Sequence, residues 1–80
     1  MNQILVHAEP TSNPNAIKFN LNCPINSHRA PLTQALQTLT QIENIDFFEN
    51  SITVFKKANS DWGNLIPQVE KVILENIKTN

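Results

Sequence analysis

Few side chains in this 80-residue sequence have the chemistry to hold a metal or attack a substrate. Cys23 is the single cysteine, and His7 and His28 are the only histidines. A thiolate and two imidazoles suit zinc, iron or copper. The spacing of these three residues matches no zinc or iron template, so they are weak candidates for a metal site. Without a neighbouring basic residue or histidine, Cys23 is more typical of an inert structural cysteine.

Catalysis by a nucleophile requires a serine, threonine or cysteine that meets a base and an orienting acid. Neither histidine lies in a recognisable nucleophile motif. The single glycine, Gly63, excludes a glycine-rich loop of the kind that holds phosphates. We therefore expect no catalytic residues, and we expect that the protein is not an enzyme.

A polar loop at residues 10–15 is the strongest candidate for a binding surface. Its two prolines fix the backbone, and its two asparagines tolerate turn geometry, so it can present amides to a partner at little entropic cost. The candidate partner-binding residues are Asn13, Pro14, Asn15, Lys18 and Trp62. Two alternatives stay open: the asparagines bond the loop's own backbone and hold the flanking strands in register, and Trp62 belongs to the core.

Charge and composition argue against several classes of protein. Six basic and seven acidic side chains are dispersed along the chain, which disfavours a nucleic-acid partner. The one adjacent basic pair, Lys56 and Lys57, is typical of a solvated strand end. No stretch approaches the roughly 20 apolar residues that cross a bilayer, and the segment Met1–Glu9 lacks a basic leader. With one cysteine, these features predict a cytoplasmic protein that does not bind membranes.

Alternating apolar residues predict four strands. Ile4–Ala8 and Ile17–Leu21 flank the polar loop and can pair as a hairpin. Ile45–Phe48 and Ile52–Phe55 flank a polar turn at Glu49–Ser51 and predict a second hairpin.

Two segments carry apolar stripes at helical spacing. Pro31–Gln41 has a stripe at Leu32, Ala35, Leu36 and Leu39, with Pro31 at the first helical position. The last segment has Ser60 or Asp61 as its N-cap. Its stripe comprises Trp62, Leu65, Ile66, Val69, Val72, Ile73 and Ile77. Pro67 within that segment predicts either a kink or a helix that begins near Pro67.

The predicted order is strand, strand, helix, strand, strand, helix. Two helices that each have one apolar stripe need one sheet face to cover. We therefore expect residues 1–80 to form a single α+β domain, a two-layer sandwich with a mainly antiparallel sheet and both helices on one face.

Residues 9–19 read Glu-Pro-Thr-Ser-Asn-Pro-Asn-Ala-Ile-Lys-Phe. This stretch resembles the E-P-T-P-N-P-N-A-x-K-F opening of the N-terminal domain of NifU-like scaffold proteins, with Ser12 in place of a proline. Further on, residues 30–32 resemble the family's S-P-L, residues 51–54 its F-I-T-V, and residues 61–67 its D-W-x-x-L-x-P. The usual I-P-G-V stretch is Ile-Glu-Asn-Ile at residues 42–45.

The resemblance implies a role in iron-sulfur cluster assembly, in which full-length relatives carry a second domain with a Cys-x-x-Cys pair. This sequence ends at Asn80 without that pair, and clusters are typically held by four thiolates. We therefore expect a standalone, non-catalytic accessory domain that docks onto iron-sulfur assembly proteins or client apoproteins. No cofactor is expected in the isolated domain, and iron or a cluster is reached only through a partner. The alternatives are an iron-binding protein that uses Cys23 and the histidines, and a regulatory α+β domain for a small ligand.

Overall fold

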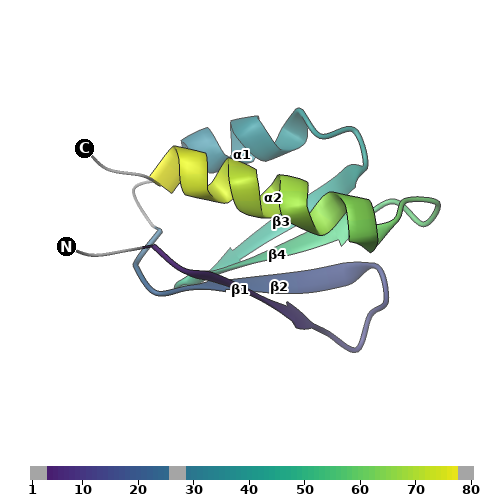
Figure 1. Ribbon diagram of the computed structural model, residues 1–80, viewed down its shortest axis with the longest axis horizontal. Helices are drawn as coiled ribbons and strands as arrows, with labels where there is room; N and C mark the ends of the chain where they lie inside the picture. The colour runs from purple at the N-terminus through teal and green to yellow at the C-terminus, as the bar shows by residue number, and fades with distance from the viewer. Residues whose placement is uncertain (1–3, 26–28, 78–80) are drawn as a thin grey trace.

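The computed structural model describes residues 4–25 and 29–77 of the chain. Its elements follow the order β-β-α-β-β-α (Figure 1). They are β1 (Val6–Pro10), β2 (Ala16–Leu21), α1 (Arg29–Gln37), β3 (Ile42–Phe48), β4 (Ser51–Lys56) and α2 (Trp62–Ile77). The predicted element order and the α+β class are confirmed.

The strands form one antiparallel sheet in the order β1-β2-β4-β3. The first hairpin pairs β1 with β2, and the second pairs β3 with β4 around a two-residue turn. Glu49 in that turn has a φ of 53°, a left-handed conformation that favours glycine. The two hairpins meet where Phe19 of β2 pairs with Ile52 of β4. β1 and β3 are therefore the edges of the sheet.

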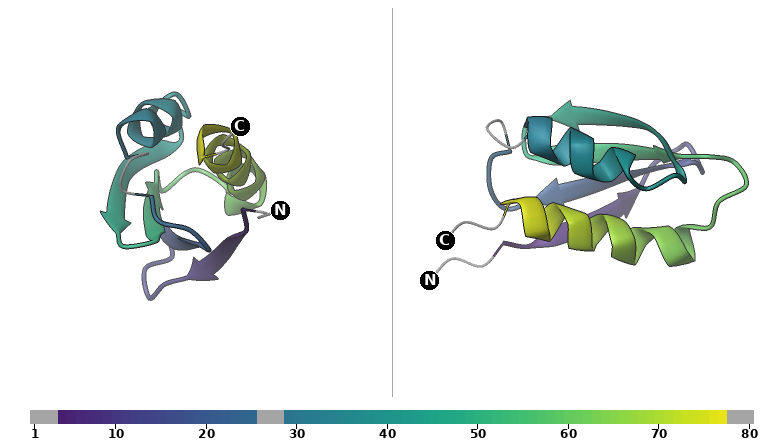
Figure 2. Two further views of the ribbon diagram at one scale, coloured as in Figure 1. Left: turned by 90° about the vertical axis from the view of Figure 1, so that its left-hand side faces the viewer. Right: turned by 90° about the horizontal axis from the view of Figure 1, so that it is seen from above.

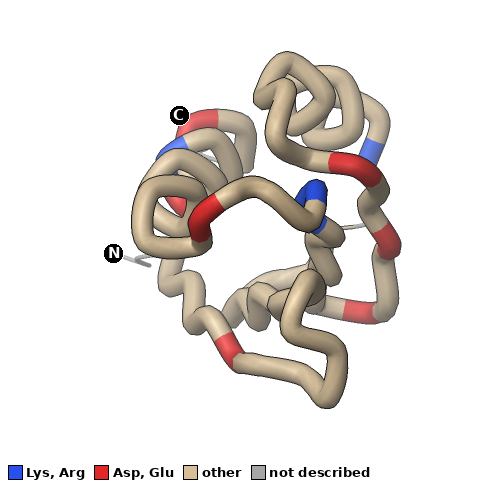
Figure 3. Tube along the Cα trace, turned by 90° about the vertical axis from the view of Figure 1, so that its right-hand side faces the viewer, with Lys and Arg blue, Asp and Glu red and all other residues tan. Residues whose placement is uncertain are grey.

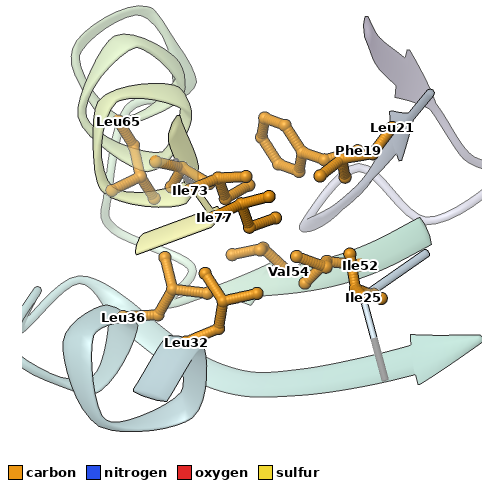
Figure 4. Packing of buried hydrophobic residues seen from close by; sticks show 11 residues of the cluster. Phe19, Leu21, Ile25, Leu32, Leu36, Ile52, Val54, Leu65, Ile73 and Ile77 are labelled. Carbon is orange, nitrogen blue, oxygen red and sulfur yellow. The ribbon is translucent and has the colours of Figure 1, made fainter. Parts of the chain in front are cut away.

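Both helices lie on the same face of the sheet, and the core fills the space between the two layers (Figures 1 and 2). Phe19, Ile52 and Val54 project from the central strands towards the helices (Figure 4). The helices contribute side chains that are equally buried: Leu32, Leu36, Leu65, Val69, Ile73 and Ile77. The predicted stripes of both helices are thus the faces that pack on the sheet. No helix in residues 4–25 and 29–77 has the length and apolar character needed to cross a membrane.

The first strand and the first helix are displaced from their predicted positions. Pro10 is the last residue of β1 and not part of the loop, and a residue without an N–H is tolerated there because β1 is an edge strand. Helix α1 begins at Arg29, so Pro31 is its third residue and not its first. N–H groups of a first turn have no partner within the helix, so the proline costs no hydrogen bond. The helix ends early, as the N–H groups of Thr38 and Leu39 bond carbonyls three residues back at 3.2 and 3.0 Å.

Strand β3 is longer than predicted. It begins at Ile42 instead of Ile45, and its register shifts between Ile42 and Asn44. Such an irregularity places an extra residue, Glu43, in the edge strand without disturbing the pairing that follows. The apolar alternation is interrupted there, so the sequence pattern missed the first three residues.

Helix α2 begins at its predicted cap and runs through Pro67. Asp61 Oδ1 accepts a hydrogen bond from the N–H of Gly63 at 3.2 Å, which identifies Asp61 as the N-cap. The alternative in which the helix begins near Pro67 is wrong, because the helix is continuous from Trp62 to Ile77. Burial of its long apolar stripe outweighs the one hydrogen bond that the proline removes.

We expect Pro67→Ala to raise the free energy of unfolding by about 1 to 3 kcal/mol, because alanine restores a helical N–H and removes the ring from the preceding turn. Urea denaturation followed by circular dichroism measures the change. Gln68→Ala is the matched control at the next exposed helical position, and it should change stability by no more than about 0.5 kcal/mol. A destabilised Pro67→Ala protein contradicts this explanation.

Candidate functional site

The loop between β1 and β2 is held by its own side chains. The hydroxyl of Thr11 accepts the N–H of Asn13 at 3.1 Å and donates to the carbonyl of Ala16 at 3.0 Å. Asn13 Oδ1 accepts the N–H of Asn15 at 2.9 Å, and the carbonyl of Asn13 accepts the N–H of Ala16 at 3.0 Å. These bonds satisfy the polar backbone groups that a strand ladder does not reach, and they stiffen the loop.

Two residues from distant parts of the chain anchor this loop to the rest of the domain. The indole Nε1 of Trp62, at the start of α2, donates to the carbonyl of Pro14 at 2.9 Å. The Lys56 ammonium, at the end of β4, donates to Asn15 Oδ1 at 3.0 Å, and the Lys56 N–H donates to the Asn15 carbonyl at 2.8 Å. The same ammonium lies 6.0 Å from the centre of the Trp62 ring, within the range of a cation-π contact. We call Pro14, Asn15, Lys56 and Trp62 the loop clamp.

The structure separates the predicted binding residues into two groups. Pro14, Asn15 and Trp62 belong to the loop clamp, and Asn13 lies next to it, bonded to the N–H of Asn15. Asn13 and Pro14 are exposed, and Trp62 is half-buried. Lys18 lies elsewhere, because strand alternation places it on the sheet face that the helices do not cover. Trp62 packs partly against the core, as one alternative predicted, and also bonds the loop, while its contact with a partner stays a prediction.

Lys56 is the residue of this site that sequence reasoning missed. The predicted solvated strand end is wrong for Lys56, which is only 7% exposed, and right for Lys57, which is exposed. The signal was present, because Lys56 continues the alternation of Ile52 and Val54 and so must face the helices. Among the described residues the other Lys and Arg positions are spread along the backbone (Figure 3).

The structure describes two of the three weak metal candidates, His7 and Cys23. His7 is exposed on the edge strand β1, and Cys23 is half-buried and packs partly against the core. His28 lies outside the described residues. Within residues 4–25 and 29–77, no group of three or more His, Cys, Asp and Glu side chains could hold a metal ion.

One known protein family matches this chain over the whole fold. The family described as "Scaffold protein Nfu/NifU N terminal" matches residues 6–80, which include every strand and helix and the complete loop clamp. The chain belongs to this family. The family predicted from residues 9–19 is therefore confirmed, and three residues of that opening motif, Asn13, Pro14 and Asn15, form the clamped part of the Nfu/NifU N-terminal domain.

One curated relative of this Nfu/NifU N-terminal domain is a NifU-like protein of Schizosaccharomyces pombe. It is 30% identical over 88 aligned residues, which cover 92% of this chain and 34% of the relative. The chain thus spans about a third of the length of that relative. No solved structure matches the chain significantly.

We expect Asn13→Ala to destabilise the domain by about 1 kcal/mol, because the N–H of Asn15 loses its side-chain acceptor. Urea denaturation monitored by the fluorescence of Trp62, the single tryptophan of the chain, measures the loss. Ser12→Ala is the matched control, since Ser12 is exposed in the same loop. Equal stability of the two variants contradicts a structural role for the Asn13 side chain.

Proposed function

We propose that this Nfu/NifU N-terminal domain is a non-catalytic accessory domain in iron-sulfur cluster assembly or delivery. Its partners are iron-sulfur assembly proteins or client apoproteins. Membership in a family described as the N-terminal part of scaffold proteins supports the biological context. The domain works in the cytoplasm, a reducing compartment that suits a chain with one unpaired cysteine.

The observation that carries this proposal is the stiff, exposed loop. Residues 11–14 are exposed, while the Pro14 carbonyl is tied to α2 and the adjoining Asn15 to β4 by the loop clamp. A segment that is already ordered before it meets a partner loses little conformational entropy on binding. The tip of the loop, Thr11–Pro14, is therefore the surface that we assign to partner contact, with the exposed part of Trp62 beside it.

The cluster itself is handled by the partner. Iron-sulfur clusters are typically held by four thiolates, and Cys23 supplies one per chain. Cys23 is also half-buried against the core, which hinders its approach to a cluster. The domain thus contributes protein contacts, and iron or a cluster reaches it only within a complex.

Anaerobic reconstitution with iron and sulfide should leave the purified domain without a stable cluster, because four thiolates are not available. Visible absorption and iron analysis after gel filtration measure the result, and the iron content should stay far below one cluster per chain. The Cys23→Ser variant is the control and should behave identically. A stoichiometric cluster that disappears in Cys23→Ser refutes the proposal and favours direct cluster binding.

Photo-crosslinking in cells tests the loop as the contact surface. A photo-reactive amino acid at Ser12 should capture proteins that assemble or receive iron-sulfur clusters, because Ser12 lies at the exposed loop tip. The same amino acid at Glu75, exposed on α2, is the control and should not enrich them. Capture of the same proteins from both positions, or of none with a link to clusters, counts against the proposal.

A further inference from the structure

Lys56 is a charged residue at a position of β4 that faces the apolar core. It follows Ile52 and Val54 on the face of β4 that the helices cover, and it is 7% exposed. Its ammonium donates to two neutral oxygens, Asn15 Oδ1 at 3.0 Å and the carbonyl of Lys57 at 3.3 Å. Among the described residues no carboxylate forms an ion pair with it.

Core packing alone does not account for this charge. The Lys56 side chain is largely buried, so its ammonium has less contact with water than that of a surface lysine, and two neutral acceptors and one aromatic ring take the place of part of that water. An unbranched apolar side chain of similar length, such as methionine, fills the same space without that loss of hydration. Residues that break the packing rule in this way tend to be retained for function.

The contacts of Lys56 show what the charge does. Asn15 lies 41 residues away in the sequence, so the bond from the ammonium ties the loop to the inner strand β4. Asn15 in turn donates its N–H to Asn13 Oδ1, so its position sets that of the exposed tip. Trp62 holds the neighbouring carbonyl of Pro14 and lies under the same ammonium, which joins the two anchors.

We infer that Lys56 is a positioning residue, which fixes the loop tip Thr11–Pro14 in the one conformation that a partner binds, although the partner does not touch Lys56 itself. The inference rests on the proposed function in one respect, that the loop is the contact surface. The tip offers hydroxyls, an amide and a proline ring but no charge. It therefore fits a neutral, hydrogen-bonding surface on the partner protein, and its binding should vary little with salt.

The test compares Lys56→Met with Lys57→Met, which removes the same charge from the exposed neighbour. We expect Lys56→Met to fold with an unchanged or higher urea midpoint, because it removes a buried charge. Its Asn15 and Ala16 amides should exchange with solvent roughly tenfold faster than those of Lys57→Met, measured by NMR, because the loop has lost one anchor. Equal exchange rates in the two variants overturn the positioning role.

A second variant keeps the test decisive if Lys56→Met does not fold. Asn15→Asp places a carboxylate beside the Lys56 ammonium and converts its hydrogen bond to a neutral amide into an ion pair. The Ala16 amide should then exchange several-fold more slowly than in the unmodified protein. Unchanged or faster exchange overturns the inference.

Crosslinking from Ser12 in the Lys56→Met background separates this inference from the proposed function. Capture of cluster-related proteins should fall at least about fivefold in Lys56→Met and stay unchanged in Lys57→Met. In the wild type and in Lys57→Met, the yield of captured protein should stay nearly constant between low and physiological salt. Unchanged capture by Lys56→Met overturns the positioning role and leaves the proposed function intact. If the unmodified protein captures no such proteins from Ser12, the proposed function fails, whatever the exchange rates show.

Discussion

The antiparallel pairing of β2 with β4 is the contact on which the rest of the structure depends. Each hairpin alone is a two-stranded ribbon that cannot shield its apolar face from water. The pairing joins the hairpins into one sheet and sets Phe19 beside Ile52, so that a single core forms beneath both helices. It also continues to the end of β4, where the N–H of Lys56 bonds the carbonyl of Asn15. The strand pairing that forms the core therefore also places Lys56 beside the loop.

The loop clamp shows how a small domain can hold an exposed segment still. A domain of this size is stable by only a few kcal/mol, so an ordered loop needs several contacts that act together. Here the loop bonds itself through Thr11 and Asn13 and is then fixed at two points by Trp62 and Lys56. The buried charge is a cost to the core, and a preformed surface is the gain. This trade-off is expected where binding requires one conformation.

Membership in the Nfu/NifU N-terminal family gives the loop a biological context but not a ligand set. The chain spans about a third of the length of its Schizosaccharomyces pombe relative, and it has one cysteine, whereas four thiolates typically hold a cluster. The proposed function assigns partner contact to the surface of the domain. The exposed loop tip and its anchors form a hydrogen-bonded part of that surface.

The sequence by itself determined the elements, their order and the family. Periods of two and about 3.6 residues are local properties, so Ile17–Leu21 and the α2 stripe were visible without coordinates. The opening motif is also local, and it identified the family. The ends of the strands and helices were harder to predict from the sequence. Pro10 is tolerated because β1 is an edge strand, and Pro31 is tolerated because it lies in the first turn of α1, and neither fact is visible in the local sequence. Only the tertiary structure decided that Lys56 is buried and that it meets Asn15 and Trp62, since these contacts join residues far apart in the chain and exist only after the two hairpins have paired.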